Sequence, residues 1–476
     1  MRGNLQSLSY YRWLVFGVTV MGTFMATLDS SIVNVALPVI ADSLGTQLTT
    51  VQWVVTAYLL AISSLLPLFG RAGDMLGRRR IFTAGFLIFT IGSALCGFSF
   101  NIKLLIAARV IQAVGASMIM ANSQALVAGA FPGQDRGRAL GMVGTVVALG
   151  SMTGPSLGGL LVGSLGWSSI FLINLPIGII AFILGQFVLK DDVSRREESF
   201  DFFGAFLFAV GMLSLLLLLS EGHTWGWRSR ISIITAAISL VSFGWFIRYE
   251  QQISQPMIDL SLFRHWPFLA GNLAALFSFM AMFCNNLLLP FYLTDILNLT
   301  PTQTGLLITP FPLLLAVVAP LSGYLSEKVS LKLLTVSGLA LTASGLLFLS
   351  TIDTGVPLWQ IALCQAVLGI GNGLFQSPNN NSVLSSVAPD KLGIAAGLNA
   401  LVRNVGMVSG TAAAVSIFEG RRLLLLEKLT EPTPDQLTAA FLSGYHTALL
   451  AGACFAAVAA VISLNRRSHV KPAANS

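Results

Sequence analysis

Long apolar stretches separated by short polar connections dominate the chain. A helix that spans a membrane needs about 20 mostly apolar residues, and fourteen stretches of the 476-residue sequence come close to that length. The pattern therefore predicts an all-α integral membrane protein with fourteen transmembrane helices. We place these helices at residues 13–35, 50–69, 81–100, 104–128, 138–162, 168–189, 202–220, 231–247, 266–290, 303–325, 333–351, 358–377, 393–418 and 443–464.

The polar connections divide the helices into a 6 + 2 + 6 arrangement. Residues 190–201 form the longest charged stretch and separate six predicted helices from two further ones, after which six more follow. We predict an N-terminal six-helix bundle over 1–190 and a C-terminal six-helix bundle over 251–476. Residues 191–250 would supply a charged linker and two extra transmembrane helices.

A degenerate internal repeat relates the two predicted bundles. A glycine, an acid, a small residue and a base recur at the same spacing in residues 70–79 and 323–332. Each segment follows the second helix of its bundle. Transporters built from structural repeats show such internal symmetry, so the repeat favours a transporter.

Composition supports a membrane protein and its charge distribution sets the orientation. Only 10% of the residues are charged and the mean hydropathy is +0.79, whereas soluble proteins have about 25% charged residues. The net charge of +7 needs no nucleic acid, because most basic residues fall in connections on one side, as the positive-inside rule requires. We expect a multi-pass protein of the cell (inner or plasma) membrane with both termini in the cytoplasm.

Residues 70–80, Gly-Arg-Ala-Gly-Asp-Met-Leu-Gly-Arg-Arg-Arg, carry a loop signature. Gly70, Asp74, Gly77 and Arg78 match the cytoplasmic motif of the major facilitator superfamily, although Ala72 stands where that family usually has leucine. Glycines permit a tight turn between two helix ends, and Asp74 can cap or pair there. The resemblance implies that this loop holds the two bundles in one conformation; an ordinary basic loop is the alternative.

The fifth predicted helix contains a glycine-rich motif at residues 150–161. Gly150, Gly154 and Gly158 recur every four residues and leave a bare groove along one helix face. Pro155 permits a bend, and with Gly159 the segment resembles the motif of exporters in the same superfamily. We expect the groove to let the helix approach the opposite bundle closely, against the alternative of plain helix packing.

Three further segments extend the resemblance over nearly the whole chain. They are Leu105 to Ala116, which includes Arg109 and Gln112, together with residues 28–38 and 166–176. These resemble the fourteen-helix drug:proton antiporters of the QacA/EmrB type. The resemblance implies a major facilitator fold and proton-coupled efflux that confers multidrug resistance.

Asp29 is the one acid of the 20 that lies well inside a predicted span. An ionised carboxylate there is costly and marks a functional site by default. We interpret Asp29 as the proton-coupling residue, with a structural anchor as the alternative. Helical spacing places a polar stripe on another face of the same helix, and we predict that this stripe lines the substrate cavity. Its members are Thr23, Thr27, Ser30 and Asn34.

Two arginines lie within predicted helices. Arg109 lies about 8 Å and Asp29 about 9 Å below the outer helix ends, so the two are able to pair, and protonation of Asp29 would then release Arg109. Arg403 lies about 15 Å deep, and we assign it with Gln112 to the cavity. Two arginines against one acid disfavour dicationic substrates. Residues 303–325 also lack the acid that the dication exporters of this family carry in helix ten.

Other function classes find no support in the sequence. It has no phosphate-binding G-x-x-x-x-G-K-[ST] motif, no enzyme signature and no metal cluster, and its four cysteines lie singly in four predicted spans. We therefore expect no enzyme and no cofactor, with protons as the coupling ion. The expected partners are a small-molecule substrate, protons and the lipid bilayer, without nucleic acid; accessory export proteins stay open.

The sequence predicts a proton-coupled efflux transporter, an antiporter that exports drugs or other small amphipathic molecules by alternating access. A narrow-specificity exporter of one antibiotic, lipid or metabolite carries the same motifs and is the first alternative. An importer fits the exporter motif less well. A non-transporting sensor or scaffold would have no need of an isolated buried acid.

Overall fold

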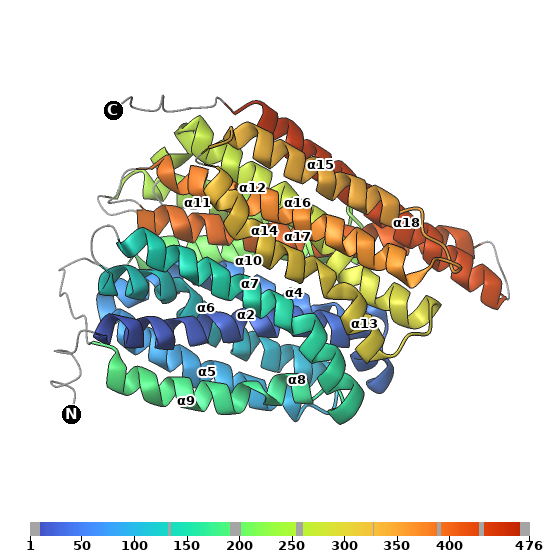
Figure 1. The fold of residues 1–476 in the computed structure, drawn as a ribbon, viewed down its shortest axis with the longest axis horizontal. Coiled ribbons are helices and arrows are strands. Elements are labelled where there is room, and N and C mark those ends of the chain that lie inside the picture. Colours follow the sequence, from blue (N-terminus) through green and yellow to red (C-terminus); the bar gives the residue numbers. More distant parts are fainter. Residues whose placement is uncertain are drawn as a thin grey trace. The chain divides into compact units, whose positions relative to one another are not determined.

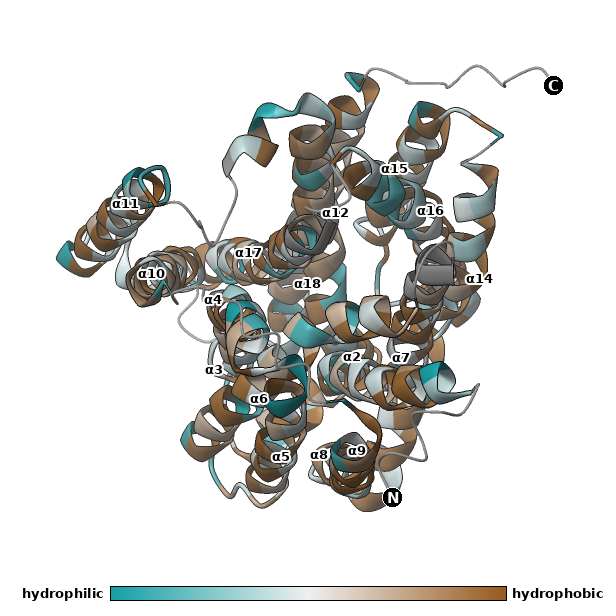
Figure 2. Ribbon diagram, turned by 90° about the vertical axis from the view of Figure 1, so that its left-hand side faces the viewer, coloured by the Kyte–Doolittle hydropathy of each residue, from teal (hydrophilic) through white to brown (hydrophobic). Residues whose placement is uncertain are grey.

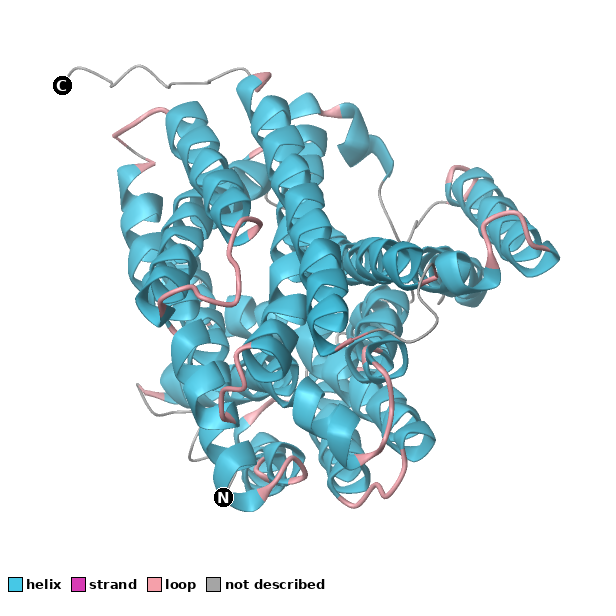
Figure 3. Ribbon diagram, turned by 90° about the vertical axis from the view of Figure 1, so that its right-hand side faces the viewer, coloured by secondary structure: helices cyan, strands magenta, loops and turns pink. Residues whose placement is uncertain are grey.

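The computed structural model describes residues 10–131, 135–190, 201–253, 260–326, 328–387, 392–427 and 433–466. Within these ranges the chain consists of helices joined by turns and loops, and no strand occurs (Figure 3). Apolar residues dominate the helices (Figure 2). The all-α prediction is confirmed.

The helices follow the predicted order along the chain (Figure 1). Those before the linker are α2 (Tyr11–Ser43), α3 (Leu48–Val51), α4 (Trp53–Leu76), α5 (Arg78–Gly97), α6 (Ile102–Ala130), α7 (Asp135–Leu165), α8 (Ser169–Leu172) and α9 (Asn174–Val188). After it come α10 (Phe202–Trp225), α11 (Arg230–Glu250), the 3-10 helix η1 (Leu260–Arg264), α12 (Trp266–Phe291), the π-helix η2 (Tyr292–Ile296), α13 (Pro301–Ile308), α14 (Pro310–Leu325), α15 (Leu331–Leu349), α16 (Leu358–Ser385), α17 (Leu392–Leu426) and α18 (Pro434–Leu464).

Thirteen helices of the described chain are long and apolar enough to cross a membrane. They coincide with thirteen of the fourteen predicted spans. The remaining span, 138–162, falls within α7, a helix of 31 residues, so the count of fourteen stays a prediction. Several helices are longer than their apolar stretches: α2 continues to Ser43 and α18 begins at Pro434. Hydropathy locates the apolar part of a helix, whereas the backbone hydrogen bonds continue into its polar ends.

The chain forms two compact units. Unit 1 comprises residues 1–259, 286–309 and 411–416, and unit 2 comprises 260–285, 310–410 and 417–476. In unit 1, α5 packs on α6 and α2 on α7, while α10 lies between α4 and α11 (Figure 2). In unit 2, α16 packs against both α14 and α15, and α15 packs against α18.

The loop motif forms a sharp junction between α4 and α5. Gly77 has φ +99°, in the region that favours glycine, and it is both the C-cap residue of α4 and the N-cap residue of α5. Asp74 Oδ1 accepts a hydrogen bond of 2.9 Å from Arg78 Nε, one turn later, and forms an ion pair of 2.8 Å with Arg78 Nη2. The related junction in unit 2 begins α15 with a Ser330 cap instead; Glu327, its acid, lies outside the described residues.

The glycine groove of α7 contacts a different partner from the one expected. A Cβ on Gly150 would lie 3.1 Å from the carbonyl of Phe24, and one on Gly154 would collide with Ser31 Oγ, both on α2. Gly158 faces Ile32 of the same helix. The prediction that these glycines approach the opposite bundle is therefore wrong, because their face is already filled by the first helix of their own bundle.

The next residue of the motif turns toward α13. A Cβ on Gly159 would lie 2.6 Å from the carbonyl of Pro301 and 3.2 Å from Gly305 Cα. A Cβ on Gly305 would in turn meet the carbonyl of Pro155. Ser156 and Thr309 share a hydrogen bond of 2.6 Å at the same contact. Adjacent residues of a helix point about 100° apart, so one motif serves two helix contacts.

Candidate functional site: a buried carboxylate cluster

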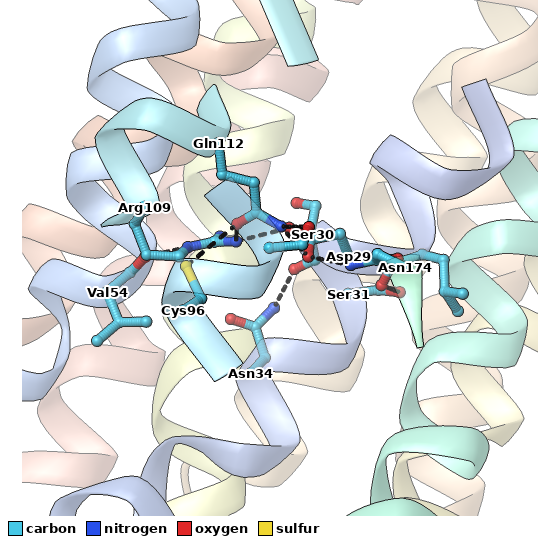
Figure 4. Close-up of polar contacts among 11 residues, drawn as sticks. Asp29, Ser30, Ser31, Asn34, Val54, Cys96, Arg109, Gln112 and Asn174 are labelled. Carbon is cyan, nitrogen blue, oxygen red and sulfur yellow. Dashed lines mark hydrogen bonds and ion pairs between the residues drawn. The ribbon is translucent and has the colours of Figure 1, made fainter. Parts of the chain in front are cut away.

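The Asp29 carboxylate lies fully buried within unit 1. Its Oδ2 accepts a hydrogen bond of 2.6 Å from Arg109 Nη1, and the two side chains are 0% and 1% exposed. Its Oδ1 accepts from Gln112 Nε2 at 2.8 Å and from Asn174 Nδ2 at 2.9 Å (Figure 4). One acid thus collects three donors, one of which carries a full positive charge.

The Arg109 guanidinium contacts groups of α4 and α6 as well as Asp29. Its Nε donates to the carbonyl of Val54 at 2.8 Å, and Nη1 also donates to Gln112 Oε1 at 2.5 Å (Figure 4). The guanidinium carbon lies 3.9 Å from the ring centroid of Tyr58, a cation–π distance. These contacts compensate the cost of removing a guanidinium from water.

The cluster draws on nearly all helices of the first bundle. Asp29 comes from α2, Val54 and Tyr58 from α4, Arg109 and Gln112 from α6, and Asn174 from the start of α9. Helix α5 adds Ser93, which accepts from Gln112 Nε2 at 2.8 Å, and Cys96, whose thiol lies 3.8 Å from Gln112 Oε1. The carboxylate bonds directly to α6 and α9, and through Arg109 and Gln112 it is linked to α4 and α5.

The cluster contains residues that the sequence did not assign. Asn174, Ser93, Val54 and Tyr58 carried no role in our predictions, although Asn174 lies in one of the family-like segments. A polar residue such as Asn174 near an apolar helix is a weak signal by itself. The backbone carbonyl of Val54 has no sequence signal, since every residue has one.

The geometry suits an exchange between two charge states. An ionised Asp29 balances Arg109, and charge-assisted hydrogen bonds of this length are the strong ones. Protonation of Asp29 would remove the counter-charge and leave a buried cation, which is strongly unfavourable. A proton arriving at this site would therefore favour a rearrangement that gives Arg109 a new partner or water.

The predicted polar stripe lies on a more accessible face of α2. Thr27, Ser30 and Asn34 are partly buried, whereas Asp29 is fully buried, so the two faces differ as expected. Thr23 is buried and donates to Ser123 on α6. Gln112, which we assigned to the substrate cavity, belongs with Asp29 in the cluster instead.

Arg403 lies in unit 2, on α17. It is partly buried, and within the described part of the chain it makes no hydrogen bond or ion pair. One and two turns further on, Gly406 and Gly410 pack against α12, where added Cβ atoms would lie 2.7 Å from Leu276 O and 2.5 Å from Met280 O. Arg403 thus lies on a part of α17 that is closely packed on α12.

The buried polar groups of unit 2 are mainly neutral amides and hydroxyls, and its charged exceptions among the described residues include Glu419 and Arg466. Asn285 donates to Gln365 Oε1 at 3.4 Å, and Gln376 donates to Asn372 Oδ1 at 3.2 Å. Asn285 Oδ1 and Gln365 Nε2 have no partner among the described residues. The described residues of both units contain no group of three or more His, Cys, Asp or Glu that is arranged to hold a metal ion.

Apolar helices of spanning length around a paired intramembrane carboxylate define a multi-pass membrane transport protein. The chain belongs to the Major Facilitator Superfamily, whose model matches residues 19–411 and 271–475. Membership confirms the major facilitator fold that the motifs predicted.

Curated relatives support the same family. The chain is 38% identical to the riboflavin transporter RibZ of Clostridioides difficile (strain 630), over 86% of this chain and 88% of the relative. It is 34% identical to the multidrug resistance protein Stp of Mycobacterium tuberculosis (strain CDC 1551 / Oshkosh), over 88% and 78%. It is 31% identical to the multidrug transporter protein MdtP of Bacillus subtilis (strain 168), over 90% and 79%. The predicted kinship with drug-efflux transporters is confirmed.

A solved structure supports the fold. The crystal structure of a bacterial homolog to the human lysosomal transporter Spinster, in an inward-facing and unoccupied conformation, matches with a TM-score of 0.69. The match covers 96% of this chain and 97% of that one at 14% identity. At this identity the likeness shows the fold alone.

Proposed function

We propose that this protein is a proton-coupled antiporter that exports small amphipathic molecules by alternating access. Asp29 carries the proton and Arg109 acts as its switch. In this proposal the protein lies in the inner or plasma membrane with both termini cytoplasmic. It uses protons as the coupling ion and no cofactor.

The observation that carries the proposal is the Asp29–Arg109 pair. The pair joins a titratable group to a permanent cation at 2.6 Å inside an apolar bundle. Because an intramembrane acid is costly, its retention points to proton or ion movement. The multidrug transporters among the relatives support export, and the glycine motif of α7 favours the same direction.

The test is Asp29→Asn in the full-length protein, reconstituted into vesicles. Asparagine keeps the size and hydrogen-bonding capacity of the side chain but does not titrate. We expect uphill transport driven by a proton gradient to disappear, while downhill exchange of substrate survives. Substrate binding should lose most of its pH dependence, because the two ligands are linked through one carboxyl.

Downhill exchange measured on the same preparation separates carrier from anchor, because the loss of the counter-charge to Arg109 lowers the melting temperature in either case. If Asp29 serves mainly as an anchor, uphill and downhill transport fall together. A stable Asp29→Asn protein that still concentrates substrate would remove Asp29 from the mechanism. A non-transporting sensor or scaffold would show neither proton movement nor exchange.

A narrow-specificity exporter is the second candidate. The relative at 38% identity is named for a single compound, riboflavin, and unit 2 buries neutral amides that suit hydrogen bonding to an uncharged ligand. Everted vesicles should be assayed with riboflavin, neutral drugs, monocations and dications. Uptake of one compound class alone would favour this candidate over multidrug export.

Charge selectivity provides a further check on both candidates. Asp29 is already paired with Arg109, and no acid lies in α14, which contains most of the tenth predicted span. A second positive charge on a substrate would therefore find no partner. We expect monocationic, neutral or zwitterionic compounds to be transported in preference to dications. Efficient dication export would contradict this expectation.

A further inference from the structure

Arg403 of unit 2 has no role in the proton mechanism proposed above. It lies well inside α17 and is partly buried. A guanidinium keeps its charge at physiological pH. A charged group inside a membrane span is costly unless it pairs with an opposite charge or meets water. Arg403 therefore requires a counter-charge or solvent.

The described helices of unit 2 offer Arg403 no acid within reach. Helices α12, α14, α15 and α16 contain no aspartate or glutamate. In α17 itself, Glu419 lies about 24 Å further along the helix and pairs with Arg422 at 3.2 Å. Asp435 lies in the first turn of α18, at the same end of the unit as Glu419. Unit 2 thus contains a cation to which its described helices supply no counter-charge.

Arg403 lies where α17 meets α12 and α16. At 3.6 residues per turn, Asn399, Gly406 and Gly410 fall within about 60° of Arg403 around the helix axis. Gly406 and Gly410 pack closely on α12. Asn399 Nδ2 donates to Asn380 Oδ1 of α16 at 2.9 Å. The face of α17 that carries Arg403 is therefore turned toward other helices of unit 2.

The Asn399–Asn380 bond also indicates which residue of α16 lies level with Arg403. Helices α16 and α17 follow each other along the chain and run in opposite directions. One turn forward from Asn399 on α17 therefore corresponds to one turn back from Asn380 on α16, which is Gln376. Gln376 is partly buried, and its Nε2 donates to Asn372 Oδ1 at 3.2 Å. Because a primary amide has two N–H groups, Gln376 keeps one N–H for a further acceptor.

We propose that Arg403 binds an anionic group of the transported molecule, an inference that rests on the transport function proposed above. The substrate class is then an amphipathic molecule with one carboxylate, either a monoanion or a zwitterion. The guanidinium donates to the carboxylate, and charge-assisted hydrogen bonds of this kind are about twice as strong as neutral ones. Gln376 supplies a further N–H. The bound carboxylate provides the counter-charge that the described helices of unit 2 lack.

A small free anion carries the same charge as the carboxylate of an amphipathic molecule. Chloride or acetate would gain only the contact with Arg403. An amphipathic carboxylate also gains the burial of its apolar part, so it should bind at far lower concentration. Competition between the two kinds of anion therefore distinguishes them.

Binding of a matched pair of dyes to the full-length protein tests the proposal. Rhodamine B has a free carboxylate, and its methyl ester differs from it only at that group. The Kd of each dye is measured by fluorescence anisotropy with the protein in lipid nanodiscs, and binding to empty nanodiscs is subtracted. We expect wild-type protein to bind rhodamine B more tightly than the ester. Arg403→Gln should weaken rhodamine B about tenfold, as the loss of hydrogen bonds to a charged group does, and should not weaken the ester.

Two further variants control the result. Asn399→Asp keeps Arg403 but places an acid four residues before it, where the two pair on a helix. The new carboxylate should compete with the ligand and weaken rhodamine B severalfold. Arg421→Gln removes the same charge from an exposed position of α17 and should change neither Kd. Monodisperse elution and cooperative melting establish that each variant is folded.

Four results would overturn the proposal. One is equal binding of the two dyes to wild-type protein, and another is unchanged binding of rhodamine B to Arg403→Gln. A third is an equal loss with Arg421→Gln, which would indicate a general charge effect. The fourth is displacement of rhodamine B by chloride or acetate at similar concentration, which would indicate a site for small free anions.

Uptake of both dyes by everted vesicles separates this proposal from the transport function. A binding preference that depends on Arg403, without uptake driven by a proton gradient, would support the anion site and contradict proton-coupled export. Proton-driven uptake of both dyes with equal Kd values would support export and overturn the anion site.

Discussion

Unit 1 buries an ion pair where five of its helices meet, whereas helices α12, α14, α15 and α16 of unit 2 bury neutral amides and hydroxyls. In unit 1 the Asp29 carboxylate accepts three hydrogen bonds, one from Arg109. In unit 2, helices α12, α14, α15 and α16 contain no aspartate or glutamate, and their buried polar contacts join amides such as Asn285 and Gln365. The two halves of one fold thus use different polar chemistry.

The difference between a buried ion pair and buried amides indicates where a response to protons is expected. Amides do not titrate, and their hydrogen bonds are worth about 1 kcal/mol each. A buried ion pair changes its energy by several kcal/mol when one partner loses its charge. Sensitivity to pH should therefore reside at the Asp29–Arg109 pair of unit 1, while the buried amides of unit 2 offer hydrogen bonds that are indifferent to pH.

The largest effect is expected from Arg109→Met. The substitution leaves the Asp29 carboxylate buried without its cation, which should cost about 3–5 kcal/mol of stability. The double variant Asp29→Asn/Arg109→Met should recover most of that loss, since both charges are gone, yet it should not concentrate substrate. Unfolding in detergent and uphill transport in vesicles measure the two properties.

Arg403→Met is the matched variant in unit 2. Arg403 has no acidic partner within the described residues, so its loss should affect stability far less than that of Arg109. Equal destabilisation by the two variants would show that the contrast between the units is wrong.

Uphill transport by the Asp29→Asn/Arg109→Met variant would refute the role of the pair in coupling.

A smaller but clear effect is expected at the α2–α7 contact of unit 1. A leucine at Gly154 would collide with Ser31 and the backbone of Ile32, and overpacking of this kind costs about 1–3 kcal/mol. Because α2 also carries Asp29, we expect Gly154→Leu to abolish export while membrane insertion persists. Gly17→Leu on α2, with nothing within 4 Å, is the control. Normal export by Gly154→Leu would exclude a role for the motif.

The finest comparison uses one residue type in both units. Gln112 and Gln365 are both fully buried, but Gln112 bonds to the charged pair and Gln365 to an amide. Gln112→Leu should cost about 1.5–3 kcal/mol, as hydrogen bonds to charged groups do, and should shift the pH profile of transport. Gln365→Leu should cost about 1 kcal/mol or less and leave the profile in place. Similar pH shifts in both variants would contradict the comparison.

Much of the fold follows from the sequence because it depends on local properties. Apolar length places the helices, and the glycine of the loop motif marks the α4–α5 junction, where Gly77 adopts φ +99°. Depth along a helix is also local information. It predicted that Asp29 and Arg109 are able to pair, and the structure shows them in contact.

The remaining features depend on which faces of different helices pack against one another. Spacing alone identified a groove at Gly150, Gly154 and Gly158 but did not identify α2 as the helix that fills it. The same limit applies to Asn174 and Gln112, whose meeting at one carboxylate requires α6 and α9 to be placed around α2. A repeat in the sequence marked similar loops, yet did not predict that the two units bury different polar groups.

The crowding of donors around Asp29 has a consequence for energy conservation. An added proton competes with donors from Arg109, Gln112 and Asn174 for the same two oxygens, and it displaces a strong charge-assisted bond. In a proton-coupled carrier, entry of a proton at such a site would be tied to a rearrangement of these donors. Leak of protons without cargo would then be limited, and the proton gradient would be kept for productive cycles.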